Sequence, residues 1–296
     1  MGEVLITSSV NKKVAAIRRL RGRREREATG LFLAEGIRIV VEAAQLGAGI
    51  KTLVVAPELL HSDLALAIVA DRRAAGTPCL EVSAEVFGSL SAKEGPQGLA
   101  AVVHQRWVDL GRTVGDAGPA TPPDAGPVAP PDDGPVAPPL WVALDAVQDP
   151  GNLGTIIRTS DAAGGAGVIL LGDSTDPYDP TSVRASMGSL FAQRLARTGF
   201  EELLVWSRRQ GYALVGTSGT AELAYDSPAP ALAGVYGGPL VLLLGSERQG
   251  LSPEQLSACD LVVKIPMAGR CDSLNLAVAA GIILYEIRGR RETPRG

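Results

Sequence analysis

The chain has 296 residues, enough for two domains of average size, and its 46% hydrophobic but only 4% aromatic residues predict an aliphatic core. Three cysteines without a CxxC pair and two histidines argue against a disulfide framework or a metal site, and indicate a reducing, cytoplasmic location. The net charge of −4 predicts no overall attraction to nucleic acid, and the lack of a signal peptide or of an apolar run of about 18 residues argues against secretion and membrane insertion.

The first predicted element is a basic helix at residues 11–27. Positions 12–26 carry eight basic residues and a single acidic one, Glu25. A cluster of this density attracts phosphate groups whatever the net charge of the chain. A solvated basic helix face would have the same composition, so both interpretations stay open. The candidate nucleic-acid contacts in the cluster are Arg19, Arg21, Arg23 and Arg24.

The rest of the first part alternates apolar strand-like stretches with helical ones. Strands are predicted at residues 31–36, 51–56, 79–83 and 98–103, and helices at 36–46, 62–75 and 84–90. Strands that alternate with helices are typical of a small α/β layer fold.

A proline-rich repeat divides the chain. Residues 116–139 read DAGPATPP, DAGPVAPP and DDGPVAPP, with nine prolines in 24 residues. Proline donates no backbone hydrogen bond and the repeat has few large side chains to bury, so an extended, solvated spacer is expected. A docking site for a proline-recognising partner is the alternative. We therefore predict a first domain at residues 1–111, a linker at 112–139 and a second domain at 140–296.

The second domain alternates more regularly. Strands are predicted at residues 140–145, 167–172, 212–218, 239–245 and 261–266, and helices at 152–164, 180–189, 200–210, 252–258 and 273–289. Continuously apolar strands are typical of a parallel sheet that helices cover on both faces. In such sheets, ligands bind beyond the carboxyl ends of the strands. The loops after these strands are therefore where functional residues are expected.

The first of these loops, residues 145–164, reads DAVQDPGNLGTIIRTSDAAG. Asn152 can cap the helix that follows, and Gly154 allows the close approach of another group. Arg158 is expected on the first or second turn of that helix, near the mouth of the sheet. A helix cap and an ordinary surface arginine remain the simpler interpretations of Asn152 and Arg158.

The second loop, residues 242–252, reads LLLGSERQGLS. It exposes Ser246, Glu247 and Arg248 in a turn before Gly250. Its glycines could cradle an adenosine or a phosphate, although glycine at the end of a strand is common.

The third loop begins the segment IPMAGRCDSLNLAVAAGIILYEI at residues 265–287. Asp272 or Ser273 is expected to cap the apolar helix, with Asn275 two residues inside it. A buried amide needs a hydrogen-bond partner, because an unpaired one costs about 1–3 kcal/mol. Asn275 therefore contacts another polar group or ties the loop down.

The common nucleotide-binding and hydrolase motifs are missing. The chain has no GxGxxG after a strand and no GxxxxGK[ST], which disfavours a Rossmann dinucleotide site and a P-loop. It has no GxSxG, and both histidines, His61 and His104, lie in the first domain, so Ser-His-Asp hydrolysis in the second is disfavoured.

Taken in order, the three loops resemble the signature motifs of the SpoU-type (TrmH) RNA 2′-O-ribose methyltransferases of the SPOUT superfamily. The matching text is DPGNLGTIIRTSDAAG, LGSERQGLS and IPMAGRCDSLNLAVAAGIILYE. The first domain resembles the L30e-like substrate-binding domain of that family through FLAEGIRIVVEA and EGPQGLAAVV. One position departs from the pattern: Arg248 stands where the second motif commonly has glycine.

The resemblance implies an α/β fold in which a small L30e-like domain precedes a parallel-sheet SPOUT domain with a deep trefoil knot, a rare exception among folds. It also implies a homodimer, with S-adenosylmethionine bound in the knot. Cofactor contacts would be made by Gly245, Ile265 and Leu274, with Thr217, Leu244 and Met267 as neighbours. The positions associated with catalysis and the RNA target are Asn152, Arg158, Glu247, Ser273 and Asn275, and Arg184 is added to the RNA contacts.

The implied reaction is methyl transfer from S-adenosylmethionine to a ribose 2′-OH of RNA. Ribosomal RNA of the 23S type is the expected substrate, because an L30e-like domain is typical of members directed to ribosomal RNA. The alternatives are a transfer RNA 2′-O-methyltransferase and a non-catalytic, ribosomal-type RNA-binding protein. A class I, Rossmann-type methyltransferase is disfavoured by the missing glycine-rich loop. Because arginine stays protonated, Arg158 is expected to act as a hydrogen-bond donor.

Overall fold

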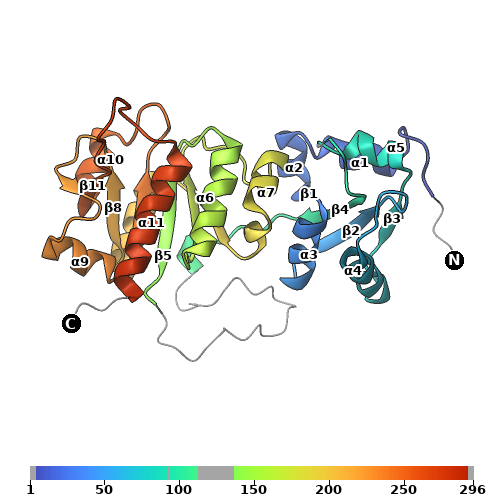
Figure 1. Cartoon of the computed structure of the whole chain (residues 1–296), viewed down its shortest axis with the longest axis horizontal. Coiled ribbons are helices and arrows are strands. Elements are labelled where there is room, and N and C mark those ends of the chain that lie inside the picture. The colour runs from blue at the N-terminus through green and yellow to red at the C-terminus, as the bar shows by residue number, and fades with distance from the viewer. Residues whose placement is uncertain (1–4, 93, 113–136, 293–296) are drawn as a thin grey trace. The chain divides into compact units, whose positions relative to one another are not determined.

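The computed structural model of the chain describes residues 5–92, 94–112 and 137–292 (Figure 1). These residues form two compact units. The first unit contains the described residues up to Gln105 together with Asp176–Phe191, and the second contains the others. Most of the proline-rich repeat lies outside the described residues, so the extended spacer stays a prediction.

The first unit begins with two short helices in place of the single basic helix predicted at residues 11–27. They are α1 (Lys12–Arg19) and α2 (Arg23–Thr29). Gly22 lies between them with extended backbone angles, φ −85° and ψ 133°, which a continuous helix does not allow. The side chain of Asn11 caps α1 by accepting from the amide of Lys13. The break therefore ends the first helix at Arg19 and starts the second at Arg23.

A four-stranded mixed sheet forms the centre of the first unit, as the predicted α/β layer fold requires. Its order is β1 (Leu31–Glu35), β4 (Leu99–His104), β2 (Ile50–Val55) and β3 (Cys79–Glu81). β4 runs antiparallel to both of its neighbours, and β3 runs parallel to β2. The helices of this part are α3 (Ile37–Gln45), α4 (Asp63–Ala74) and α5 (Ala84–Leu90).

The segment Asp176–Phe191 packs in the first unit although it follows a strand of the second domain in sequence. It contains α7 (Pro180–Ser186) and a short 3-10 helix, η2 (Ser189–Phe191). The ring of Phe32 on β1 lies 4.7 Å from the ring of Tyr178 and 6.2 Å from that of Phe191, measured between centroids. Aromatic burial of this kind stabilises the contact between β1 and the segment.

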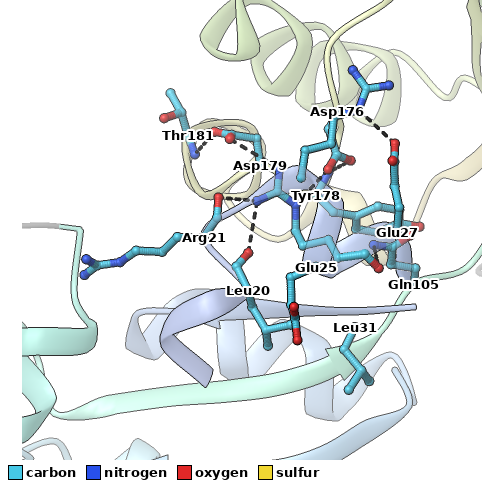
Figure 2. A network of polar contacts seen from close by, with 12 residues as sticks. Leu20, Arg21, Glu25, Glu27, Leu31, Gln105, Asp176, Tyr178, Asp179 and Thr181 are labelled. Carbon is cyan, nitrogen blue, oxygen red and sulfur yellow. Dashed lines mark hydrogen bonds and ion pairs between the residues drawn. The ribbon is translucent and has the colours of Figure 1, made fainter. Parts of the chain in front are cut away.

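A buried ion pair joins α2 to the same segment (Figure 2). The side chain of Arg26 is 2% exposed, and its Nε lies 2.7 Å from Oδ2 of Asp176, which is 5% exposed. Its Nη1 donates to the carbonyl oxygens of Leu20 at 3.0 Å and Arg21 at 2.6 Å. Asp179 lies 3.5 Å from Nη2. Arg26 therefore faces the interior, and its inclusion in the basic surface cluster at 12–26 was wrong.

A seven-stranded sheet forms the centre of the second unit, and all of its strand pairs are parallel, as predicted. β6 and β10 are buried at every position, which explains their unbroken apolar sequences. Two strands, β7 and β9, are additional to the five predicted. The strands in sheet order are β7 (Arg194–Thr198), β6 (Gly167–Leu171), β5 (Leu140–Asp145), β10 (Leu240–Leu244), β8 (Ala213–Thr217), β11 (Leu261–Lys264) and β9 (Leu223–Ala224).

Two of the helices that cover this sheet lie side by side, α6 (Pro150–Ala162) and α11 (Leu276–Glu292) (Figure 1). The side chain of Thr159 on α6 faces Gly281 on α11, which lets the two helices approach closely. None of the helices described is both long and apolar enough to cross a membrane. The remaining helices are η1 (Leu110–Arg112), α8 (Phe200–Gln210), α9 (Pro230–Tyr236) and α10 (Pro253–Ala258).

Candidate active site

The three loops singled out in the sequence follow the carboxyl ends of three strands of the parallel sheet, β5, β10 and β11. β5 and β10 are neighbours, with Leu144 opposite Leu244, and β8 and β11 follow on the other side of β10. The chain leaves β5 toward β6 and β7, yet it enters β10 from the side of β8. Such a change of direction is where parallel sheets bind their ligands.

Asp149, and not Asn152, caps the helix that follows β5. Its Oδ1 accepts from the backbone amide of Asn152 at 2.7 Å, and Pro150 occupies the first helical position. Asn152 therefore lies inside the first turn of α6, and its side chain is free for other contacts. The prediction that Asn152 caps this helix was wrong.

The side chain of Asn152 joins the second and third loops. Its Nδ2 donates to Oε1 of Glu247 at 3.1 Å, and its Oδ1 accepts from Nδ2 of Asn275 at 2.9 Å. The three residues, which we call the Asn–Asn–Glu network, come from three segments that lie far apart in sequence. Three of the five predicted catalytic residues are thus brought together in one chain of hydrogen bonds.

Asn275 also caps α11. Its Oδ1 accepts from the backbone amides of Ala277 at 2.9 Å and Val278 at 3.3 Å. The helix begins at Leu276, so the predicted cap at Asp272 or Ser273 was wrong. The Ser273 hydroxyl instead donates to Oδ1 of Asp272 at 3.2 Å. Asn275 thus serves both the start of a helix and the network.

Glu247 is held by several donors at once. Its Oε2 accepts from the amide of Gln148 at 3.2 Å, and its Oε1 accepts from the amide of Asp149 at 3.4 Å as well as from Asn152. Burial raises the pKa of Glu247, but these hydrogen bonds outweigh burial and hold the pKa below its ordinary value. Glu247 is therefore an ionised acceptor at neutral pH, suited to fixing loops rather than to giving up a proton.

The turn after β10 requires glycine at two positions. A Cβ atom on Gly245 would lie 2.1 Å from the carbonyl carbon of Gly250, and Gly250 has a φ of +66°. The amide of Gly250 donates to the carbonyl of Ser246 at 3.0 Å, which closes the turn. Among the non-glycine residues that are described, only Ala146 and Met187 have positive φ. Arg248 is therefore accommodated without the backbone strain that a glycine position would impose.

The residues predicted to contact a cofactor lie at the carboxyl ends of β8, β10 and β11 or in the loop that follows. Thr217 is half-buried and its hydroxyl donates to the carbonyl of Leu243 at 3.4 Å. Leu244 is buried, so it can offer a ligand only its backbone. Met267 and Leu274 are 38% and 39% exposed, so their apolar side chains can contact a ligand.

These residues are suited to binding S-adenosylmethionine. Exposed apolar side chains can cover an adenine ring, and the backbone groups at the strand ends can bind its polar edge. In the described ranges 5–92, 94–112 and 137–292, no three His, Cys, Asp or Glu residues are grouped so that they could hold a metal ion. The individual cofactor contacts, Ile265 among them, stay predictions.

Arg158 is not part of the Asn–Asn–Glu network. The helix α6 begins at Pro150, so Arg158 lies on its third turn and not on the first or second, where it was expected. It follows Asn152 by six residues, which is about 9 Å along the helix axis. Its side chain is exposed and makes no hydrogen bond or ion pair with the part of the chain that the structure describes. A guanidinium in this state is available to a ligand.

Four of the five predicted RNA contacts in the first unit are exposed arginines, and two of these form exposed ion pairs. Arg19 pairs with Glu25 at 3.3 Å and Arg23 pairs with Glu27 at 2.8 Å. Ion pairs of this exposed kind contribute only about 0.2–1 kcal/mol, so phosphate can compete for the arginines. Arg21 donates to the carbonyl oxygens of Ser89 and Ser91, and Arg24 is exposed. Arg184 on α7 is half-buried and donates to Oγ1 of Thr181 at 3.4 Å.

Comparison with known protein families gives two matches, one on each side of the proline-rich segment. The SpoU rRNA Methylase family matches residues 139–285, and the MRM3-like substrate binding domain matches residues 11–101.

Two relatives of known name align over nearly the whole chain. The 23S rRNA (guanosine(2553)-2'-O)-methyltransferase RlmP of Bacillus subtilis is 31% identical over 288 residues, which cover 96% of this chain and 99% of the relative. The 23S rRNA (uridine(2479)-2'-O)-methyltransferase of Streptomyces viridochromogenes is 33% identical over 286 residues, or 93% of this chain and 88% of the relative.

Solved structures agree with this alignment. The AdoMet-bound rRNA methyltransferase from Sinorhizobium meliloti superposes with a TM-score of 0.80 at 37% identity and covers 97% of both chains. The SpoU methyltransferase AviRb from Streptomyces viridochromogenes, in complex with AdoMet, superposes with a TM-score of 0.79 at 32% identity and covers 96% of this chain and 100% of that one.

Proposed function

The chain belongs to the SpoU rRNA methylase family, and from this premise we propose that it transfers a methyl group from S-adenosylmethionine to a ribose 2′-OH of ribosomal RNA. The family that the three motifs indicated is thus confirmed. The observation that carries the proposed activity is the Asn–Asn–Glu network, because it joins all three motif loops at the ligand-binding edge of the sheet. The names of the relatives, which are 23S rRNA methyltransferases, support the choice of substrate.

S-adenosylmethionine, when bound, supplies a methyl group on a sulfonium that is already a good electrophile, so positioning contributes much of the acceleration. Gly245, Ile265 and Thr217 would hold it through the strand ends, and Met267 and Leu274 through their apolar surfaces. We place the trefoil knot of the superfamily in the segment between β11 and α11. The hydrogen bond from Asn275 to Asn152 holds the end of that segment against the loop after β5.

Arg158 would act on the ribose. A guanidinium stays protonated near neutral pH, so it can donate hydrogen bonds but cannot take the hydroxyl proton. Donors aimed at the 2′-oxygen orient it toward the methyl group and stabilise the negative charge that develops as its proton leaves. Asn152 and Asn275 would hold the loops and the ribose, Ser273 would contact the RNA target, and Glu247 would fix the network.

Replacing Asn275 with aspartate should separate its two contacts. Aspartate still accepts from the amides that begin α11, but it cannot donate to Asn152, and it brings a second charge toward Glu247. We expect a free energy of unfolding close to that of the wild type and a rate of methyl transfer that is lower by more than tenfold. Asn275→Ala should show the same loss of activity and, in addition, about 1 kcal/mol lower stability from the missing cap. Urea unfolding and initial rates on the two variants measure both effects, and full activity in either would exclude the network from catalysis.

We propose that the domain at residues 1–111 binds the RNA and the domain at 140–296 carries the reaction, with 112–139 as the linker.

Changing Arg19, Arg21, Arg23 and Arg24 together to glutamine should weaken RNA binding. It should also flatten the dependence of affinity on salt, because each lost phosphate contact lowers the slope by about 0.7–0.9. Binding isotherms at several salt concentrations give the slope, with exposed Lys51→Gln as the control. A slope equal to that of the wild type would show that the cluster is only solvated.

We also propose that the protein is a cytoplasmic homodimer. Val278 and Tyr285 on α11 are each 51% exposed, and exposed apolar side chains on one helix fit an interface between subunits. The cytoplasmic location rests on the composition of the chain, which has three cysteines without a CxxC pair.

The RNA class can be tested with the purified full chain, labelled S-adenosylmethionine and separate ribosomal and transfer RNA fractions. We expect label in the ribosomal RNA. Label in transfer RNA alone would support the alternative substrate, and RNA binding without any label would support a non-catalytic protein.

A further inference from the structure

A cavity of about 350 Å³ lies beside the Asn–Asn–Glu network in the second unit. Its walls are Ala146, Gln148 and Asp149 from the loop after β5, and residues 246–249 from the turn after β10. Glu247 belongs both to the network and to the wall. A ligand in this cavity would therefore lie next to the residues assigned to the reaction.

The charges that line the cavity are not equivalent. Asp149 is engaged by the amide of Asn152, and both oxygens of Glu247 accept from Asn152 and from the amides of Gln148 and Asp149. Arg248 is exposed and makes no hydrogen bond or ion pair with any residue in the described ranges. Asp149 and Glu247 keep their negative charges, but their oxygens are occupied by donors, and the guanidinium of Arg248 is the cation of this wall that can bind an anion at the rim.

Arg248 is held on a turn of fixed shape. The amide of Gln249 donates to Oγ of Ser246 at 3.2 Å, and the amide of Gly250 donates to the carbonyl of Ser246 at 3.0 Å. The backbone of Glu247, one residue earlier, is fixed by its side-chain contacts to the loop after β5. A long side chain on a rigid turn can reach into the cavity or over its rim with little loss of backbone entropy.

From this arrangement we propose that Arg248 is a specificity-determining residue that binds a backbone phosphate of the RNA next to the target ribose. This inference rests on the proposed methyl transfer to RNA. A guanidinium binds phosphate oxygens through two parallel hydrogen bonds, which would fix the strand in register as well as attract it. The carboxylate of S-adenosylmethionine is the other anion that could reach the site, and the experiment separates the two.

The test compares Arg248→Gln with the wild type in three measurements on the full chain: steady-state kinetics, the salt dependence of RNA binding, and calorimetry with S-adenosylmethionine. The KM for RNA should rise about tenfold, the salt slope of RNA binding should fall by about one charge, and kcat should change little. Affinity for S-adenosylmethionine, measured by calorimetry, should stay unchanged. Arg248→Lys should recover only part of the RNA affinity, because an ammonium cannot form the paired bonds.

Arg209→Gln is the matched control, since Arg209 is also an exposed arginine of the second unit and has no hydrogen bond or ion pair with described residues. It should leave all three measurements unchanged. A weaker affinity of Arg248→Gln for S-adenosylmethionine with normal RNA binding would place the cofactor carboxylate there and overturn the proposal. Wild-type values throughout would also overturn it. Because RNA binding is measured without turnover, failure of the proposed reaction is seen separately, as absence of methyl transfer by the wild type.

Discussion

Arg158→Ala should reduce the rate of methyl transfer by about 10²–10³-fold, the loss typical when a donor to a developing oxyanion is removed. The arginine is exposed on α6 and has no partner among the described residues, so its removal breaks no internal contact. The free energy of unfolding should therefore stay close to that of the wild type, and the affinity for S-adenosylmethionine should stay within a few-fold. Arg158→Lys should also be slow, since a single ammonium does not reproduce the planar set of donors.

Single-turnover rates with saturating S-adenosylmethionine measure this effect, because product release then does not mask the chemical step. Arg209→Ala serves as the control for the loss of an exposed arginine in the same unit. A turnover rate for Arg158→Ala close to that of the control would mean that Arg158 is a surface residue and that another group orients the hydroxyl.

Arg26→Ala should have the largest effect on stability, a loss of about 3–5 kcal/mol in the free energy of unfolding. The mutation leaves the carboxylate of Asp176 buried without its cation, and two carbonyl oxygens at the end of α1 without a donor. Arg26→Lys should recover little, because one ammonium cannot reach the carbonyls and Asp176 together.

Urea unfolding followed by circular dichroism measures the loss, with Arg24→Ala as the control. Arg24 lies two residues away on the same helix but is exposed. Its replacement should change the free energy of unfolding by less than about 0.5 kcal/mol, as for other surface positions. Equal stability of the two variants would show that the buried ion pair contributes nothing net.

The parallel sheet and the loops that carry the site are predictable from the sequence for a physical reason. Strands such as β6 and β10 are apolar at every position because helices cover both faces, and polar residues directly after them must lie at the ends of the sheet. β7 escapes prediction because two of its five residues are arginines, and β9 because it has only two residues. Both of these strands lie at the edges of the sheet.

The contacts within the site depend on information that no local pattern contains. Both Asp149 and Asn152 are good capping residues, and only the three-dimensional start of α6 shows that Asp149 takes the cap. Because Asp149 takes the cap, the side chain of Asn152 can bind both Glu247, 95 residues away, and Asn275, 123 residues away. The same holds for Arg26, whose partner Asp176 is 150 residues distant.

The function of the cavity beside Arg248 also could not be read from the motif alone. The sequence shows only that Arg248 stands where relatives of the SpoU type commonly have glycine. The structure shows that the left-handed position of this turn is Gly250, so the arginine adds a charge without strain. A departure from a family motif thus indicates a property of this chain rather than a defect.

The most direct test of the account is the position of the transferred methyl group. Ribosomal RNA treated with the purified protein and S-adenosylmethionine should be digested to nucleosides and analysed by mass spectrometry, with an untreated sample beside it. We predict one additional nucleoside whose methyl group remains with the sugar fragment, and about 10²–10³-fold slower formation of it when Arg158→Ala replaces the wild type. A methyl group that stays with the base fragment, or no additional methylated nucleoside after treatment with the folded wild-type protein, would contradict ribose 2′-O-methylation.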